Sequence, residues 1–355
     1  MAAQIPATTK QWSLSSLDGS EGFDALKFTE VPVDPPGDSQ VLVKMEAGSL
    51  NYRDIIIPLG KYPFATKQNV IPGSDGTGTV LAVGRHVSRF KPGDKVVTLF
   101  NQEHIGGPIN AVNNATGLGG ALDGTFRAVG AFNEQGLVHR PAALSALEAA
   151  TLPCSALTAW NALYGHTDGA LTAGQWVLTQ GTGGVSIAAL QFAKAAGARV
   201  IATTGSKDKE ATLRKLGADH VINYKETVEW GAEARDITGG VGVDHVVEVA
   251  GPTSMRQSIK AIKTAGIITI IGFVGGTEHE KEPSFLECLS NLFTARGVLV
   301  GNRVQLEDMC RAIDANPDKL RPVIDDKVFK LDQLKEAYEH LQSGKHFGKV
   351  CIKID

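Results

Sequence analysis

The chain has 355 residues, a formal net charge of -3, 21% charged residues and 43% hydrophobic residues. This balance excludes a polycationic nucleic-acid binder and an acidic disordered protein, and no stretch approaches the roughly 18 apolar residues of a membrane helix. The four cysteines form no CxxC pair and the first residues lack an apolar signal core, so we expect a cytoplasmic protein without disulfides. The length predicts two domains.

The first domain is expected over residues 1–146, where short β-rich runs alternate with glycine or proline turns. The clearest runs are Val41–Met45, Gly78–Val83 and Asp94–Leu99. Such alternation predicts an antiparallel, barrel-like sheet. The glycine- and asparagine-rich stretch Asn101–Gly124 predicts a long loop over this domain.

The second domain is expected over residues 147–302. It begins with a helical pattern at Leu147–Tyr164, followed by short apolar strands that helix-length segments separate. The predicted strands are Trp176–Gln180, Ala198–Ala202, His220–Tyr224, Val243–Val249, Ile267–Ile271 and Gly297–Val300. Because parallel neighbours need long crossovers, this alternation predicts an α/β fold with a doubly wound parallel sheet. Residues 303–355 predict helices and a last strand, Lys349–Ile354, that returns to the first domain.

The strongest motif follows the first of these strands and opens a helix. It consists of Gly181, Thr182, Gly183, Gly184 and Val185, with Ser186 at the third small position of a dinucleotide-binding fingerprint. The first glycine permits the tight turn, the second lets a pyrophosphate approach the backbone, and the helix N-terminus supplies N–H donors. This context predicts a nicotinamide dinucleotide site, with a ligand-free glycine turn as the alternative.

The end of the second strand predicts which nicotinamide cofactor binds. NAD-binding proteins usually place a carboxylate there, whereas residues 202–207 contain none. Thr204, Ser206, Lys207 and Lys209 could instead hold a 2′-phosphate, and Tyr224 could reach the adenosine end. We therefore expect NADPH; a solvated helix face remains the alternative for each lysine.

Several segments together resemble the medium-chain dehydrogenase/reductase superfamily, over nearly the whole chain. They are Asn51–Asp54, Ile71–Gly78, Gly84, Pro92–Val96 and Gly181–Val185. The resemblance implies a GroES-like β-barrel catalytic domain and a Rossmann domain that binds NADP. Within the superfamily the chain looks most like the zinc-free quinone oxidoreductases and "zinc-type alcohol dehydrogenase-like" proteins.

Departures from the zinc alcohol dehydrogenases predict that no zinc binds. Asn51 stands where those enzymes have a cysteine, and Gly73–Asp75 reads Gly-Ser-Asp where they have Gly-His-Glu. Cys154 matches the third ligand position, which leaves one ligand where a catalytic zinc needs three.

The resemblance also implies roles for single residues. Asn51, Tyr52 and Arg53 become candidate catalytic residues, and Asn51, Tyr62 and Cys154 candidate substrate contacts. Tyr52 could donate a proton or simply pack, and Arg53 could pair with Asp54. Further positions are expected near the cofactor: Thr158, Ala250, Gly251, Gly272, Phe273, Val274, Gly301 and Arg303.

These features predict an NADPH-dependent reductase of a small carbonyl compound, a quinone or an α,β-unsaturated ketone, because hydride transfer without a metal needs an electrophilic substrate. One alternative is an enoyl reductase acting on biosynthetic thioesters, since Leu50–Asp54 also resembles the enoyl-reductase domains of polyketide synthases. Others are a zinc-free carbonyl or alcohol reductase and a non-catalytic nucleotide-binding protein. A homodimer that pairs through the sixth strand is expected.

Overall fold

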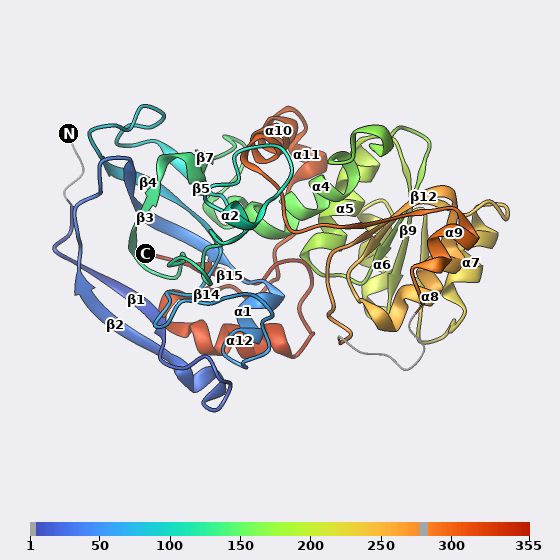
Figure 1. Ribbon diagram of the computed structural model, residues 1–355, viewed down its shortest axis with the longest axis horizontal. Helices are drawn as coiled ribbons and strands as arrows, with labels where there is room; N and C mark the ends of the chain where they lie inside the picture. Colours follow the sequence, from blue (N-terminus) through green and yellow to red (C-terminus); the bar gives the residue numbers. More distant parts are fainter. Residues whose placement is uncertain (1–4, 277–282) are drawn as a thin grey trace. The chain divides into compact units, whose positions relative to one another are not determined.

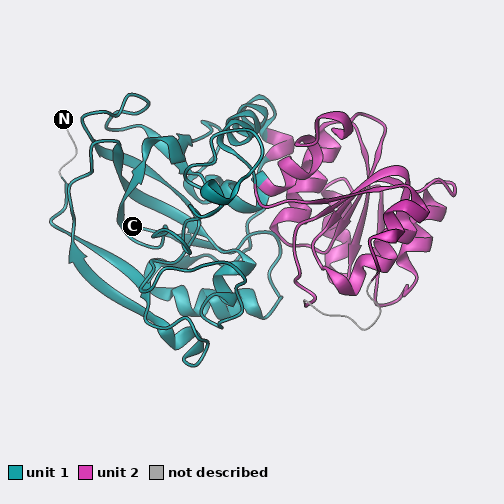
Figure 2. Cartoon of the chain, in the orientation of Figure 1, with its two compact units in different colours: residues 1–157, 301–317, 321–355 teal, residues 158–300, 318–320 magenta. Residues whose placement is uncertain are grey.

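The computed structural model describes residues 5–276 and 283–355. They form two compact units, which Figure 2 shows in teal and magenta. Unit 1 comprises residues 1–157, 301–317 and 321–355, and unit 2 comprises residues 158–300 and 318–320. Among the described residues, no helix combines the length and the apolar character that crossing a membrane requires.

Unit 1 is built on a seven-stranded sheet and a separate antiparallel ribbon of two strands (Figure 1). Its strands are β1 (Thr8–Leu14), β2 (Leu26–Pro32), β3 (Gln40–Ser49), β4 (Asp75–Val83), β5 (Lys95–Thr98), β6 (Val129–Asn133), β7 (Leu137–His139), β14 (Phe329–Lys330) and β15 (Cys351–Lys353). Its helices are η1 (Gly22–Ala25), α1 (Tyr52–Ile56), α2 (Ala111–Asn114), η2 (Glu134–Gly136), α3 (Ala146–Ala149), η3 (Leu152–Ala156), α10 (Arg303–Ala315), η6 (Leu331–Gln333) and α12 (Leu334–Gln342).

Strand β3 is the centre of the unit 1 sheet. It pairs antiparallel with β4 and β6, and near its end with β15, where Cys351 lies opposite Ser49. Its side chains Val41, Val43 and Met45 are buried, as expected of a strand with neighbours on both sides. All three β-rich runs expected here fall on strands. The ends of β3 and β15 therefore bring residues near 50 and near 350 together.

Unit 2 contains the parallel sheet. Its strands are β8 (Trp176–Gln180), β9 (Arg199–Thr204), β10 (His220–Asn223), β11 (Val243–Glu248), β12 (Ile262–Ile270) and β13 (Thr294–Gly297). Its helices are α4 (Leu157–Tyr164, beginning at the last residue of the first unit 1 segment), η4 (Thr167–Gly169), α5 (Gly184–Ala195), η5 (Lys207–Lys209), α6 (Glu210–Lys215), α7 (Trp230–Ile237), α8 (Pro252–Ala261) and α9 (Leu286–Asn291), while α11 (Pro317–Leu320) spans a unit boundary.

The six strands follow the order β10-β9-β8-β11-β12-β13, and every neighbouring pair is parallel. This is the order of a dinucleotide-binding Rossmann sheet, whose halves diverge from the first strand. Buried side chains such as Leu178, Ile201, Val246 and Ile268 form the core against it. The predicted α/β fold class is confirmed, and the carboxyl ends of β8, β9, β11 and β12 share one edge of the sheet.

The sixth strand differs from the prediction. It spans Thr294–Gly297 and not Gly297–Val300, because Val300 adopts a left-handed φ of 52°, which an extended strand does not allow. The apolar run misled the assignment: Val300 is buried after the strand has ended, whereas the edge strand β13 itself is largely exposed.

The helical stretch predicted at Leu147–Tyr164 is divided into three pieces. Between α3 and α4 lies η3, a π-helix that contains Pro153 and Cys154. Proline has no N–H to donate, so a regular α-helix loses a hydrogen bond at this point. Single π-helical turns are rare and occur often at functional sites.

Candidate functional site

The glycine turn of unit 2 has the conformation that a dinucleotide site requires. Gly181 follows β8 with φ of 75°, which favours glycine, and Gly183 precedes α5 as its N-cap. A Cβ built on Gly183 would meet no atom of the described residues within 4 Å, so the space in front of this backbone is open. Ser186 Oγ donates to Gln180 O over 2.6 Å and ties the helix to the strand end. A phosphate group could therefore approach the backbone at Gly183 and the first turn of α5.

The second strand end assembles the residues expected at the adenosine end of a cofactor. The backbone N–H of Ser206 donates to Thr204 Oγ1 over 3.1 Å, and that of Tyr224 donates to Thr204 O over 3.0 Å. The Tyr224 ring covers Gly205, where a Cβ would lie 2.4 Å from the phenolic oxygen. Lys207 is exposed beside this group and Lys209 is half-buried. Hydroxyl and ammonium groups thus lie within one short stretch, from Thr204 to Lys209.

A buried carboxylate that sequence reasoning did not single out lies at the end of β11. Glu248, with no exposed surface, accepts from the backbone N–H groups of Ala250 and Gly251, each over 3.0 Å. Its other oxygen accepts from Gln180 Nε2 over 2.7 Å. The end of β8 and the loop after β11 are therefore both hydrogen-bonded to one side chain, Glu248.

The loops after β11 and β12 lie side by side. Val274 N donates to Val249 O over 3.2 Å. A Cβ added at Gly251 would lie 3.0 Å from the Cα of Phe273. Gly272 and Phe273 are half-buried, whereas 56% of Val274 is exposed. These expected cofactor positions are therefore brought together at the carboxyl edge of the sheet, where ligands of such folds bind.

Three other expected cofactor residues belong to other segments of the chain. Gly301 and Arg303 belong to unit 1, and the Arg303 guanidinium is held there by Gln135 and by Glu307, 3.5 Å away. Thr158 is buried near the start of α4.

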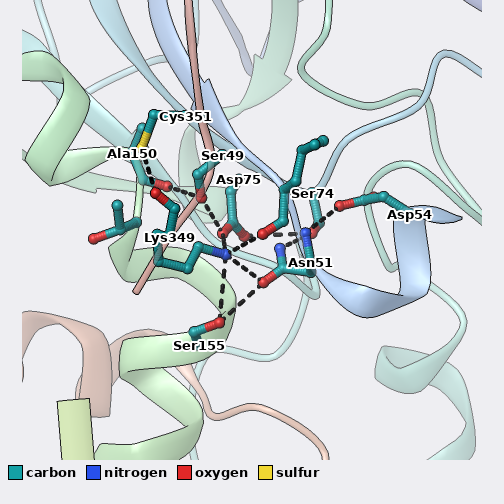
Figure 3. A network of polar contacts seen from close by, with 12 residues as sticks. Ser49, Asn51, Asp54, Ser74, Asp75, Ala150, Ser155, Lys349 and Cys351 are labelled. Atoms are coloured by element: carbon teal, nitrogen blue, oxygen red, sulfur yellow. Dashed lines mark hydrogen bonds and ion pairs between the residues drawn. The ribbon is translucent and has the colours of Figure 1, made fainter. Parts of the chain in front are cut away.

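In unit 1, Asn51 sits in a buried network of polar side chains (Figure 3). Asn51 Oδ1 accepts from Lys349 Nζ over 2.6 Å and from Ser155 Oγ over 3.0 Å, while Asn51 Nδ2 donates to Ser74 Oγ over 3.3 Å. Lys349 also reaches Asp75 Oδ2 at 3.2 Å. Asn51, at the N-cap of α1, is thereby joined to β4, to the π-helix and to the segment before β15.

The carboxylate of Asp54 closes the start of α1. Its Oδ2 accepts from the backbone N–H of Asn51 over 2.7 Å, and its Oδ1 lies 3.7 Å from Arg53 Nη1. Burial raises the pKa of Asp54 to about 6, while the neighbouring Arg53 opposes that rise. The predicted pairing of Arg53 with Asp54 is therefore present, though it is long.

Arg53 contacts two other segments of unit 1. Its Nε donates to Tyr62 Oη over 3.2 Å and its Nη1 to Leu118 O over 2.8 Å. The guanidinium also lies over the rings of Tyr62 and Phe100, at 5.0 and 4.8 Å. Arg53 thus packs α1 against the segments around residues 62 and 118. The resemblance implied a catalytic role for Arg53 and not this packing role.

Two further candidates differ in exposure. Tyr52 is 37% exposed. Cys154, in the π-helix, is partly buried, and burial raises the pKa of its thiol to about 12. A thiol with that pKa stays protonated at neutral pH, so Cys154 is a poor nucleophile.

Sequence reasoning missed most of the unit 1 network: Ser49, Ser74, Asp75, Ser155 and Lys349 were not singled out as site residues. The contact between Asn51 and Lys349 joins positions 298 residues apart, which no local pattern encodes. Ser74 and Asp75 did appear in the sequence as the residues that replace the zinc-binding Gly-His-Glu pattern, which was the one available signal.

Comparison with known proteins bears on both units. A family model described as "Alcohol dehydrogenase GroES-like domain" matches residues 37–142, and one described as "Zinc-binding dehydrogenase" matches residues 184–315. A zinc-type alcohol dehydrogenase-like protein of Schizosaccharomyces pombe is 45% identical over 343 residues, 95% of this chain and 98% of that protein. The chain belongs to the medium-chain dehydrogenase/reductase superfamily.

Two more similarities support an oxidoreductase. The chloroplastic quinone-oxidoreductase QR1 of Triphysaria versicolor is 32% identical over 346 residues, covering 94% of this chain and 95% of QR1. A solved structure of a candidate alcohol dehydrogenase from Sinorhizobium meliloti 1021 superposes with a TM-score of 0.89 at 38% identity, covering 99% of this chain and all of that one. The chain is thus a medium-chain oxidoreductase with the fold of that superfamily.

The name of one matching family model raises the question of zinc. Among residues 5–276 and 283–355, no three or more His, Cys, Asp or Glu side chains gather where they could hold a metal ion. Asn51 and Ser74, at two positions that the resemblance gives to zinc ligands, are hydrogen-bonded to each other. An ammonium group already occupies the Oδ1 acceptor of Asn51, so these side chains do not fit a catalytic zinc.

Proposed function

We propose that this protein is an NADPH-dependent reductase that transfers hydride, without zinc, to the electrophilic carbon of a quinone or an α,β-unsaturated ketone. The observation that carries the proposal is the state of Asn51. At a position where relatives have a zinc-binding cysteine, its amide oxygen is bound by a buried ammonium, and its amide nitrogen faces the other way.

The cofactor part of the proposal rests on unit 2. The open backbone at Gly183 and the N-terminus of α5 suit a pyrophosphate. Ser206, Lys207 and Lys209 would hold the 2′-phosphate of NADPH, with Tyr224 beside the adenosine. Bound NADPH would supply a hydride, which is two electrons and one hydrogen nucleus, and would become NADP+.

The substrate part of the proposal follows from charge. Hydride addition to the β-carbon of an enone moves a pair of electrons onto the carbonyl oxygen, and that oxygen then needs hydrogen-bond donors. We assign this role to Asn51, whose Nδ2 keeps one N–H beyond its bond to Ser74. Tyr52, which is partly exposed, is the candidate that donates the proton completing the saturated ketone. Cys154 and Tyr62 would line the substrate site.

Quinones and enones are the proposed substrates because no Lewis acid is proposed to activate a plain ketone or an alcohol. The 32% identity to a quinone oxidoreductase supports this choice. The same experiment tests the competing substrates, which are enoyl thioesters and simple aldehydes.

The test is oxidation of NADPH by the purified protein, followed at 340 nm, with separate panels of quinones, enones, enoyl thioesters and aldehydes. We expect turnover with quinones or enones, a preference for NADPH over NADH, and the same rate after treatment with a zinc chelator. Turnover confined to thioesters or to aldehydes, or loss of activity on chelation, would contradict the proposal.

We also propose that the protein forms a homodimer through unit 2. Among the described residues β13 is the last strand of its sheet. Phe285, the N-cap of α9, and Leu286 and Leu289 within α9 are exposed to 92%, 63% and 68%. An exposed edge strand beside apolar side chains is a surface that pairs readily with a second copy. Sedimentation equilibrium should give a dimer for the native chain and a monomer for Leu289→Glu, while Val241→Glu, at an equally exposed valine outside α9 and β13, should remain dimeric.

A further inference from the structure

Lys349 is a buried lysine whose ammonium group is surrounded by oxygen atoms. Its side chain is 6% exposed, and Nζ lies 2.5 Å from Leu50 O, 2.6 Å from Asn51 Oδ1, 3.2 Å from Asp75 Oδ2 and 3.4 Å from Ser155 Oγ. Figure 3 shows the side chain reaching into the group from one side. A backbone hydrogen bond holds the chain next to Lys349 in place, because Leu50 N donates to Val350 O over 2.9 Å.

The ammonium decides which way the Asn51 amide is turned. The oxygen and nitrogen of an asparagine amide have nearly the same shape, so only their hydrogen-bond partners distinguish them. An ammonium group has donors and no acceptor, and therefore only Oδ1 can face Lys349. Nδ2 then faces Ser74, and the described residues give it that one hydrogen bond, so its second N–H is left to donate.

The charge of Lys349 also acts through the amide. A cation held 2.6 Å from the amide oxygen draws electron density toward that oxygen and makes the opposite N–H groups stronger donors. In a buried site with a low dielectric response, this effect is larger than it would be in water.

Pairing with Asp75 alone does not explain the position of Lys349. Asp75 Oδ2 also accepts from Ser49 Oγ over 2.8 Å, and Oδ1 from Ser74 Oγ over 3.3 Å. Lys349 Nζ lies 2.6 Å from Asn51 Oδ1 and 3.2 Å from Asp75 Oδ2, so the ammonium is nearer to the amide. Asp75 balances the buried charge, while the shorter contact is made to the amide.

We propose that Lys349 is a positioning residue for the reduction: it turns and polarises the Asn51 amide so that its remaining N–H binds the substrate oxygen that gains negative charge. This inference rests on the proposed function, and it adds a residue from the far end of the chain to the reaction. The cation acts through Asn51 and does not itself touch the substrate.

The test compares Lys349→Met with Lys353→Met, a control at an exposed lysine four residues along the same segment. We expect Lys349→Met to lower kcat about 100-fold, the scale for loss of an oxyanion donor, with NADPH affinity and the substrate KM nearly unchanged. Lys353→Met should match the native protein. A fall in NADPH affinity alone, with kcat kept, would overturn the proposal.

Because Lys349→Met leaves Asp75 buried without its cation, the double variant Lys349→Met/Asp75→Asn is the decisive one. It removes both members of this charge pair, so Asp75 is not left as a buried charge without its cation and the variant should fold. The proposal expects kcat to stay low in the double variant. Recovery of native kcat would mean that Lys349 serves only to balance Asp75, and would refute it.

A second readout separates this inference from the proposed function. The side-chain ¹H–¹⁵N signals of Asn51, assigned by their loss in Asn51→Ser, should move in Lys349→Met/Asp75→Asn and stay fixed in Lys353→Met. If the native protein turned over no quinone or enone, the proposed function would fail, whereas these signals would still report whether Lys349 sets the amide. Signals unchanged by loss of Lys349 would overturn the positioning role.

Discussion

The two candidate binding regions of this molecule are built in opposite ways. The glycine turn in unit 2 uses backbone groups between Gly181 and Ser186, held by contacts a few residues apart. The network in unit 1 uses side chains of Asn51, Ser155 and Lys349, which come from three distant parts of the chain. A backbone site depends on the absence of side chains, whereas a side-chain site depends on each partner being present.

This difference predicts different sensitivities to mutation. Adding side-chain atoms should damage the unit 2 site, because they would fill the open space beside the Gly183 backbone. Changing a charge should damage the unit 1 site, because its groups are buried and each has hydrogen-bond partners to lose. The first two predictions below test these expectations and the third tests the cofactor assignment in unit 2, from the largest effect to the smallest.

The buried carboxyl of Asp54 should make the stability of the chain depend on pH. Its pKa of about 6 in the folded chain is above the ordinary aspartate value of 3.8, so the folded state binds this proton more tightly than the unfolded state. The free energy of unfolding should therefore fall as pH rises from about 4 to about 6, by about 3 kcal/mol from this group, and then level off.

Asp54→Asn should remove this part of the pH dependence, as urea denaturation at pH 4.5 and pH 7 would measure. Asp326→Asn, at an exposed position on a loop of the same unit, serves as the control and should keep the native difference. If Asp54→Asn and the native protein had the same pH dependence, the pKa of Asp54 would not be raised by burial. The unit 1 site would then be less sensitive to a change of charge than the comparison with unit 2 requires.

Gly183→Val should abolish tight cofactor binding without unfolding the protein. The backbone at Gly183, with φ of -78°, suits any residue, and a Cβ there would meet no described atom. The added side chain would occupy the space proposed for the pyrophosphate. We expect NADPH affinity, measured by fluorescence titration, to fall about 100-fold, or about 2.7 kcal/mol, while the urea midpoint changes little.

Gly297→Val is the matched control, because Gly297 also has open space at its Cβ position and no positive φ. It should bind NADPH like the native chain. An unchanged affinity in Gly183→Val would place the pyrophosphate elsewhere and would remove the backbone site from the comparison.

Lys207→Glu should change the choice between the two nicotinamide cofactors. A carboxylate at this exposed position would repel a 2′-phosphate and leave NADH unaffected. We expect about a tenfold loss of NADPH affinity at low salt, or about 1.4 kcal/mol, with a smaller loss at high salt because the position is exposed. Lys225→Glu, an exposed lysine after β10, should have little effect; equal losses for NADPH and NADH would contradict the assignment.

The sequence by itself determined the parts of this protein that depend on neighbouring residues. Strand β8, the turn at Gly181 and the helix after it are encoded within about twenty residues, because dihedral preferences and hydrophobic periodicity act over that range. The parallel sheet followed from the spacing of its strands, since a parallel neighbour needs a long connection. The superfamily was likewise readable from motifs that are each short.

Only the tertiary structure decided the partners of Asn51. Its contacts with Ser155 and Lys349 form because β15 pairs with β3 and because the π-helix packs beside them, and neither event leaves a pattern in the local sequence. The early end of β13 at Gly297 has the same origin, since Val300 is buried by its surroundings and not by a place in the sheet. Hydrogen bonds across hundreds of residues are selected by the packed fold, and a single sequence shows the donors and acceptors without showing which of them meet.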